Sequence, residues 1–342
     1  MPQYSIQIIP RVFHFKKPAG TSRGVYTQRR SWLIQLSEAG MPGRQGWGEC
    51  APLPALSCDD LPYYSDVIRA LCDDFCARGQ IDLLRWAPYP SMLFGMETTL
   101  LHLQRGTHAL YDTPFARGQE GIVINGLIWM GSRSEMFAQI RQKLEAGFRC
   151  IKLKIGAIGF EEELGLLRYI RSQFTATDVQ LRVDANGAFP AQQAMERLER
   201  LAELDLHSIE QPIRAGQWQE MARLTGQTPL PIALDEELIG ANTPAERARL
   251  LDAIRPQYVV LKPSLHGGMC GCADWIAQAS QRHIGWWVTS ALESNIGLNA
   301  IAHWCAHCHP QGAQGLGTGA LFTDNIDMPL QVRGDRLWYV AD

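Results

Sequence analysis

The chain has 342 residues, of which 46% are hydrophobic, and its formal net charge is -3. This length predicts one large domain and a smaller one, while the slight acidic balance argues against nucleic acid or an anionic membrane as a partner. No apolar run is long enough to span a bilayer, and the first residues lack the pattern of a secretory signal. The nine scattered cysteines indicate a reducing, cytoplasmic compartment.

Residues 1–115 are expected to form an α+β capping domain. Residues 4–15 and 31–36 alternate between apolar and polar side chains, and GWGECAPLP follows at 46–54, which predicts a small antiparallel sheet. Helical periodicity follows over 61–77 and 97–110. The stretch KKPAGTSRG at 16–24 is rich in glycine, small polar and basic residues, so we expect a mobile loop. This stretch and residues 50–58 are expected to carry much of the substrate specificity.

Residues 116–324 show a different pattern, in which short apolar strands alternate with amphipathic helical stretches. The eight candidate strands are 122–127, 150–156, 179–186, 207–212, 231–237, 258–264, 286–294 and 315–319. Near the carboxyl ends of seven strands, a polar residue recurs every 25 to 30 positions: Asn125, Lys154, Asp184, Glu210, Asp235, Lys262 and Ser290. A period of one strand–helix unit predicts a parallel sheet, and eight strands predict a closed barrel. No eighth long helix follows, and the tail, 325–342, is expected to return to the capping domain as a strand.

The carboxyl ends of the strands are where a barrel of this kind places its active site. Side chains two apart on a strand share a face, so the charged residues near these strand ends would point into the barrel. Burying a charge costs free energy unless an opposite charge lies close to it. Asp184, Glu210 and Asp235 are hard oxygen donors on adjacent strands and suit Mg²⁺, with Mn²⁺ as a substitute. Lys154 and Lys262 would flank this metal. The supporting residues are expected to be Lys152, Arg182, Asn186 and Glu236.

This set of side chains suits the removal of a proton next to a carboxylate. Burial and a nearby cation lower the pKa of lysine side chains in general, which makes a neutral amine available as a base. The metal would offset the charge that builds on the carboxylate oxygens as the substrate becomes an enediolate. We therefore expect a metal-dependent enzyme with a small-molecule carboxylate as its partner.

Seven motifs in a fixed order resemble those of a known family. They are IKLKIG (151–156), VDANGAF (183–189), IEQP (209–212), LDEE (234–237), LKPS (261–264), TSALESNIG (289–297) and GTGALFTDN (317–325). Over nearly the whole chain they resemble the enolase superfamily, in its muconate-lactonizing-enzyme-like subgroup, and within that subgroup the o-succinylbenzoate synthases. The resemblance implies an enolase-like (β/α)7β barrel with an N-terminal α+β capping domain. It also implies Asp184, Glu210 and Asp235 as metal ligands, Lys154 as the residue that removes and returns a proton, and Lys262 as a cation that stabilises the enediolate.

The reaction that the resemblance implies is the loss of water from 2-succinyl-6-hydroxy-2,4-cyclohexadiene-1-carboxylate, which gives 2-succinylbenzoate in menaquinone biosynthesis. The alternative is racemisation, because an N-succinylamino acid racemase uses the same two lysines. The dipeptide epimerases of the family carry an Asp-x-Asp pair where this chain has residues 317–319, Gly-Thr-Gly, which argues against that activity. The mandelate-racemase branch has a histidine where Lys262 stands, which argues against that branch as well. Outside these activities, a metal-binding scaffold without catalysis is the other alternative.

Three readings stay open at this point. Ser290 and Gly317 are either substrate contacts or turn residues. The segment HWCAHCHP (303–310), with His303, Cys305, His307 and Cys308, is either a metal site or the end of a helix, and its spacing is compressed for a structural zinc site. The sequence leaves formation of a homo-oligomer open.

Overall fold

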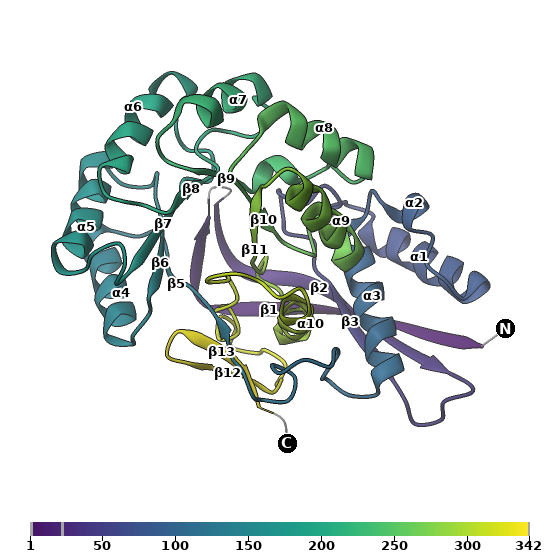
Figure 1. Cartoon of the computed structure of the whole chain (residues 1–342). Coiled ribbons are helices and arrows are strands. Elements are labelled where there is room, and N and C mark those ends of the chain that lie inside the picture. The colour runs from purple at the N-terminus through teal and green to yellow at the C-terminus, as the bar shows by residue number, and fades with distance from the viewer. Residues whose placement is uncertain (1–2, 22–23, 341–342) are drawn as a thin grey trace.

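The computed structural model describes residues 3–21 and 24–340 (Figure 1). An amino-terminal sheet with its helices lies against a barrel of parallel strands, and the carboxyl-terminal hairpin lies at the edge of that barrel (Figure 1). None of the helices within these residues is long and apolar enough to cross a membrane.

The amino-terminal part is an antiparallel sheet covered by helices. Its strands are β1 (Tyr4–Thr21), β2 (Gly24–Glu38) and β3 (Gly46–Cys50), in the order β1-β2-β3. Its helices are α1 (Tyr64–Arg78), α2 (Leu83–Trp86) and α3 (Pro90–Arg105). Ile34 and Leu36 of β2 belong to one buried cluster with Ile68 of α1 and Met96 of α3. The helix α3 lies so close to β3 that a Cβ atom on Gly95 would meet Cys50 Sγ at 2.2 Å, so the close approach requires glycine there.

The expectation of a mobile loop over 16–24 is wrong for the residues that the structure describes. β1 runs to Thr21 and β2 begins at Gly24, while residues 22–23 lie outside the described residues. The two strands pair antiparallel, with a register shift between His14 and Ala19. The Phe15 ring lies 4.6 Å from the Phe322 ring of the barrel region. Burial of this aromatic pair and the cross-strand hydrogen bonds stabilise a strand that the local composition does not indicate.

The barrel consists of parallel strands that are each followed by a helix. The sheet order is β11-β10-β9-β8-β7-β6-β5. The strands are β5 (Gly126–Ile128), β6 (Cys150–Lys154), β7 (Gln180–Asp184), β8 (Ser208–Glu210), β9 (Ile232–Leu234), β10 (Tyr258–Leu261) and β11 (Gly285–Val288). The helices are α4 (Arg133–Glu145), α5 (Phe160–Gln173), α6 (Ala191–Ala202), α7 (Trp218–Gln227), α8 (Pro244–Ile254), α9 (Gly268–Gln281) and α10 (Asn295–His307), with a 3₁₀ turn at Glu236–Leu238.

The eighth strand of the barrel is reduced to two isolated bridges. Gln314 pairs in parallel with Ile124 next to β5, and Gly315 pairs in parallel with Thr289 next to β11. The side chain of Gln314 also accepts a hydrogen bond from Val288 N at 2.8 Å. These contacts join the two edges of the seven-stranded sheet. The predicted (β/α)7β barrel is therefore confirmed, and no long helix follows the last bridge in the described residues.

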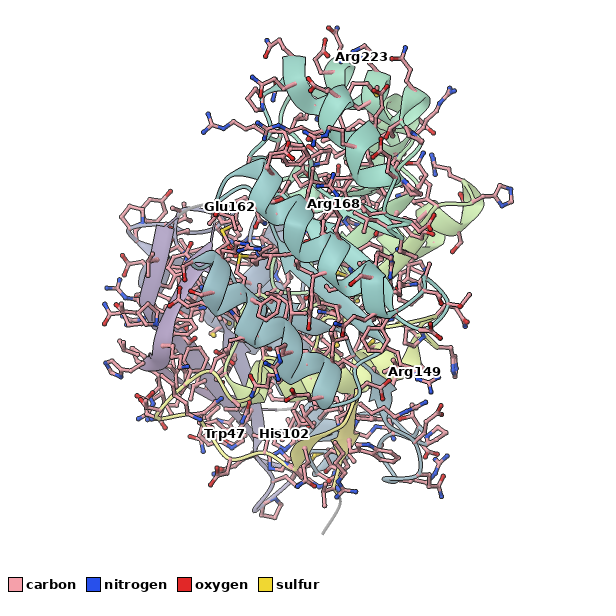
Figure 2. All side chains as sticks on the ribbon, turned by 90° about the vertical axis from the view of Figure 1, so that its left-hand side faces the viewer. Trp47, His102, Arg149, Glu162, Arg168 and Arg223 are labelled. Carbon is pink, nitrogen blue, oxygen red and sulfur yellow. The ribbon has the colours of Figure 1, made fainter. Side chains whose placement is uncertain are left out.

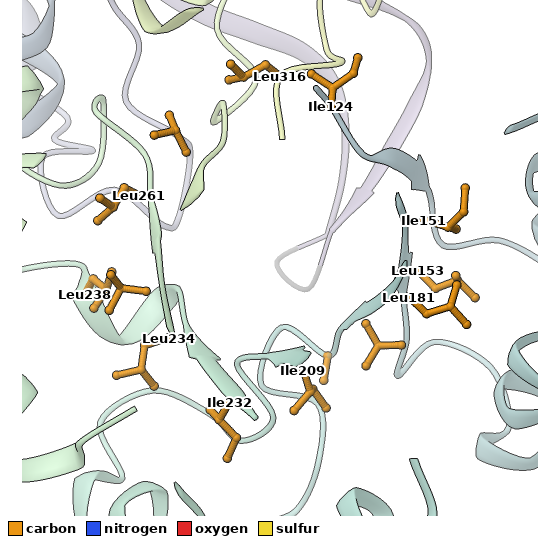
Figure 3. Packing of buried hydrophobic residues seen from close by; sticks show 14 of the residues in the cluster. Ile124, Ile151, Leu153, Leu181, Ile209, Ile232, Leu234, Leu238, Leu261 and Leu316 are labelled. Atoms are coloured by element: carbon orange, nitrogen blue, oxygen red, sulfur yellow. The ribbon is translucent and has the colours of Figure 1, made fainter. Parts of the chain in front are cut away.

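Alternation along the strands separates an apolar shell from a charged interior. Ile151, Leu153, Leu181 and Ile209 are fully buried, and they point away from the barrel axis toward the helices (Figure 3). Their neighbours on the same strands must therefore point inward. The outer faces of the helices are polar; Figure 2 shows charged side chains such as Arg168 of α5 on this surface.

The carboxyl-terminal tail differs from its predicted place. β12 (Leu330–Arg333) and β13 (Arg336–Tyr339) form a hairpin that pairs with β4 (Ile122–Val123), instead of with the sheet of the capping domain. The segment that does reach the capping sheet lies just before the tail, where Lys16 N donates to Leu321 O at 2.8 Å. The sequence pattern identifies a strand, but only the packing decides which free edge it joins.

Candidate active site

Three buried carboxylates lie on neighbouring strands inside the barrel. The parallel register pairs Lys154 of β6 with Asp184 of β7, and Asp184 with Glu210 of β8. Asp235 directly follows β9 and is fully buried, while Asp184 and Glu210 are 1% and 2% exposed. Three carboxylates at one level of a barrel repel one another unless positive charge lies between them.

Lysine side chains supply that positive charge in the structure. Lys152 Nζ lies 3.0 Å from Asp184 Oδ2 and 2.6 Å from Glu210 Oε2, so it bridges two of the carboxylates. Lys154 Nζ lies 3.3 Å from Asp184 Oδ2. Lys262, which directly follows β10, forms an ion pair with Asp235. The two lysines predicted to act on the substrate therefore lie at opposite ends of the row of carboxylates.

The carboxylates and lysines shift one another's protonation. Burial alone would raise the pKa of Asp184, but Lys152 and Lys154 hold it below its ordinary value. Burial and the charge of Asp184 raise the pKa of Glu210. Burial would lower the pKa of Lys262, but the charge of Asp235 raises it. This direction is opposite to the one that the sequence argument expects, because the nearest charges to Lys262 are carboxylates.

The donor set fits a divalent cation in chemical kind, although lysines lie among the carboxylates. Within the described residues, no group of three or more His, Cys, Asp or Glu side chains is arranged to hold a metal ion as the side chains stand. Yet Glu210 Oε1 and Asp235 Oδ1 are buried without a hydrogen-bond partner, and such an atom costs about 1–3 kcal/mol. A cation held by Asp184, Glu210 and Asp235 would use hard oxygen donors of the type that Mg²⁺ prefers.

Asn186 and Glu236 form a chain of hydrogen bonds that ends on Lys154. Asn186 Oδ1 accepts from Lys154 Nζ at 2.8 Å, and its amide nitrogen donates to Glu236 Oε1 at 2.9 Å. Asn186 has φ of 45°, a left-handed conformation that asparagine tolerates better than most residues. Of the four predicted supporting residues, the structure thus brings Asn186 directly to Lys154 and connects Glu236 to it through Asn186.

Arg182 does not support the carboxylates as predicted. It lies on the inward face of β7 but two residues before Asp184, and its guanidinium stacks 4.4 Å from the Trp287 ring. Arg182 Nη1 donates to Ala313 O at 2.9 Å. No carboxylate among the described residues forms an ion pair with it. Two residues that are two positions apart on a strand point to the same face but lie at different depths along the barrel. Arg182 therefore lies in the layer of side chains below the one that contains Asp184.

Gln211 is a buried organiser of the site that the sequence reasoning missed. Its Oε1 accepts from the backbone N–H groups of Asp235 and Glu237, both at 3.2 Å. Its Nε2 donates to Ile213 O at 3.0 Å. It therefore ties the end of β8 to the turn that carries Asp235. The sequence signal for this role is a polar residue between Glu210 and a proline at a strand end, which on its own appears only as part of the IEQP motif.

A cavity of about 1090 Å³, counting the space at its open mouth, lies above the lysines and carboxylates. The predicted contacts Ser290 and Gly317 both line it. Ser290 Oγ also forms a 2.6 Å hydrogen bond with Thr318 Oγ1, another lining residue, which the sequence did not single out. The apolar part of the lining comes from both domains. Its main side chains are Tyr26, Leu53, Leu56, Trp129, Leu292 and Leu321.

The histidines and cysteines of 303–310 have separate partners. The His303 ring is buried between the rings of Phe115, at 5.2 Å, and Tyr339, at 4.7 Å. His307 stacks on Tyr111 at 4.5 Å. Cys305 is fully buried. These residues belong to α10 and its end, and no metal cluster is present among them in the described part of the chain.

Comparison with known proteins agrees with this geometry. The family described as "Enolase C-terminal domain-like" matches residues 135–338, and "MenC, N-terminal domain" matches residues 21–103. The o-succinylbenzoate synthase of Desulfotalea psychrophila is 45% identical over 94% of this chain and 95% of its own length. The crystal structure of MenC from Desulfotalea psychrophila has a TM-score of 0.83 and 39% identity, covering 98% of this chain and 99% of that one.

A more distant relative has a different activity. The L-Ala-D/L-Glu epimerase of Bacillus subtilis is 26% identical over 85% of this chain and 81% of its own length. Its structure in complex with substrate is similar to this one with a TM-score of 0.82, at 19% identity and with 99% of this chain and 96% of that chain covered, which concerns the fold alone. By its sequence and its fold, the chain belongs to the o-succinylbenzoate synthase family of the enolase superfamily.

Proposed function

We propose that the chain is a lyase that removes water from 2-succinyl-6-hydroxy-2,4-cyclohexadiene-1-carboxylate to form 2-succinylbenzoate in menaquinone biosynthesis. The observation that carries this proposal is the position of Lys154 and Lys262 at the two ends of the buried carboxylate row, beneath an open cavity. Names of relatives support the same reaction: the Desulfotalea psychrophila protein is an o-succinylbenzoate synthase.

Lys154 is proposed to be the acid–base residue. Hydrogen bonds from its Nζ to Asn186 and Asp184 orient it at the floor of the cavity. In a syn elimination, the proton and the hydroxyl leave from one face of the ring, so one amine can take the proton and return it to the departing hydroxyl as water. The new carbon–carbon double bond then completes an aromatic ring, which makes the step favourable.

Lys262 is proposed to act by its charge. It is paired with Asp235 and would face the other side of the substrate, where a fixed cation stabilises negative charge on an enediolate. The family generally uses a divalent metal, and we propose Mg²⁺, with Mn²⁺ as a substitute, on Asp184, Glu210 and Asp235. When bound, this metal would offset the negative charge of the substrate carboxylate.

The proposed cellular setting is the cytoplasm, with a small-molecule carboxylate as the partner. All nine cysteines are free, and several of them are buried. Unpaired cysteines are typical of proteins in a reducing compartment.

Ultraviolet absorbance separates this reaction from its rival, racemisation of N-succinylamino acids. Dehydration creates an aromatic ring, whereas racemisation creates no new chromophore. We expect the purified protein with Mg²⁺ to convert the cyclohexadiene carboxylate to a product that co-elutes with 2-succinylbenzoate, and we expect Lys154→Ala to form none. Polarimetry with an N-succinylamino acid tests the rival in parallel. A folded wild-type protein that changes optical rotation but forms no aromatic product would contradict the proposal.

A further inference from the structure

Arg29 is a buried cation at the seam between the capping domain and the barrel. It lies on β2 and is 1% exposed. Its Nη1 donates to Pro52 O at 2.6 Å, and its Nη2 donates to Ala51 O at 2.6 Å and to Ala291 O at 3.2 Å. A buried guanidinium is tolerated only where such acceptors surround it. One side chain therefore links a loop of the capping domain to a loop of the barrel.

The barrel loop is also held through the backbone N–H of the same residue, Ala291. Glu293 Oε2 accepts from Ala291 N at 2.8 Å, and Glu293 also accepts a hydrogen bond from Ser264 Oγ. Arg29 thus holds the carbonyl of Ala291 while Glu293 holds its N–H group. The charge of Glu293 also opposes the effect of burial, which lowers the pKa of Arg29.

The next residue of this loop is strained. Leu292 has φ of 64°, a left-handed conformation that costs a branched residue about 1–2 kcal/mol. Residues in such conformations persist only where the surrounding structure determines them, and they cluster at ligand sites. The hydrogen bonds of Arg29 and Glu293 to the carbonyl and the N–H group of the preceding residue, Ala291, supply that constraint.

Both loops that Arg29 joins line the cavity. Leu53 and Leu56 follow Ala51 and Pro52 in the capping domain, and Ala291 and Leu292 come from the barrel. The buried members of this set form one apolar cluster across the seam. Arg29 itself does not line the cavity. The separation of the two loops sets how much room the apolar wall leaves for a substrate.

We propose that Arg29 is a positioning residue that sets how tightly the pocket binds its substrate, by holding the capping loop 51–56 against the barrel loop 289–292. The inference rests on the proposed function, because it concerns how tightly the same pocket encloses its substrate. Loss of the guanidinium would let the two loops separate, which weakens binding of the succinyl-bearing ring without changing the lysines and carboxylates below.

Arg29→Met and Arg29→Lys test this role. Methionine keeps much of the side-chain volume but donates no hydrogen bond, and lysine keeps the charge but not the planar, forked donor. We expect Arg29→Met to raise the KM for the cyclohexadiene carboxylate and the Ki of 2-succinylbenzoate at least tenfold, with kcat within threefold of wild type. Arg29→Lys should give smaller increases. The matched control is Arg30→Gln, because Arg30 is the exposed neighbour on the same strand, and all its constants should match wild type.

The outcomes are distinguishable. A merely structural role would lower the melting temperature while KM and Ki stay within twofold of wild type, and this result overturns the inference alone. Arg29→Lys keeps the test possible if Arg29→Met does not fold. A fall in kcat at unchanged KM also overturns it, since Arg29 would then act on the chemical step. If wild-type protein forms no 2-succinylbenzoate in the absorbance assay and does not bind it in a calorimetric titration, the proposed function and the inference both fail.

Discussion

Lys154 Nζ lies 2.8 Å from Asn186 Oδ1. Asn186 is itself oriented by Glu236, which accepts from its amide nitrogen at 2.9 Å. The proposed acid–base amine is therefore held by a neutral amide as well as by the carboxylate of Asp184, which lies 3.3 Å away. Among the described hydrogen bonds, the side chains of Lys152 and Lys262 bond to carboxylates and not to Asn186.

Asn186→Gly removes this hydrogen bond while glycine accommodates the φ of 45°. We expect kcat to fall by about tenfold to a hundredfold, which corresponds to roughly 1.4 to 2.7 kcal/mol of barrier. KM should change less than threefold, because the hydrogen bonds of this amide go to Lys154 and Glu236. Steady-state absorbance assays measure both constants. A rise in KM at unchanged kcat would instead assign Asn186 to substrate binding.

Arginine substitutions distinguish the two lysines. Lys154→Arg and Lys154→Ala should both be nearly inactive, because arginine keeps the charge but cannot release a proton near neutral pH. Lys262→Arg should retain more activity than Lys262→Ala, since that position requires charge. Turnover of the four variants is compared after circular dichroism confirms folding. The mechanism is wrong if Lys154→Arg stays within about tenfold of wild type, about 1.4 kcal/mol of barrier.

Removal of divalent metal should abolish turnover, and Mg²⁺ or Mn²⁺ should restore it. A metal ion that binds the folded protein but not the unfolded protein should also raise the melting temperature. This measurement is independent of activity. Glu210→Gln is the matched variant, because it preserves the side-chain volume but removes one of the three carboxylates. Its melting temperature should respond less to Mg²⁺ than that of wild type. Full turnover in metal-free protein would disprove the assignment of the three carboxylates.

His303 should make the fold sensitive to acid. Burial, and secondarily His108, lowers its pKa to about 3 in the folded protein, whereas an unfolded histidine titrates near about 6.5. Between these values only the unfolded state binds the proton, so the free energy of unfolding decreases as pH falls through this window. For one such group the loss reaches about 2 kcal/mol at pH 5.

His303→Leu tests this effect and also removes two buried ring nitrogens that have no hydrogen-bond partner. The variant should lose less stability than wild type between pH 7 and pH 5, as measured by urea unfolding at each pH. The difference between the two proteins isolates His303 from the other buried histidines. Parallel pH profiles for the two proteins would show that this ring does not take up a proton on unfolding.

The periodic part of the architecture could be predicted from the sequence. Polar residues such as Lys154, Asp184 and Glu210 recur at the spacing of one strand–helix unit, and parallel strands necessarily bring such residues to one end of a barrel. The alternation of side chains also placed Lys152 and Asn186 inside. These predictions succeeded because they depend only on the spacing of strand–helix units along the sequence and on the two-residue period of a strand.

Tertiary structure decided the features that depend on partners distant in the sequence. The hairpin of β12 and β13 pairs with β4 and not with the sheet of the capping domain. Arg182 stacks on Trp287. The alternation of side chains along a strand could not predict this contact, because it gives the face of the strand but not the depth along the barrel. Gln211 and Arg29 act through backbone groups, which every residue carries, so no sequence motif identifies those acceptors. Local sequence thus determined which residues face the interior, whereas the packing of the two domains determined how that interior is enclosed and held.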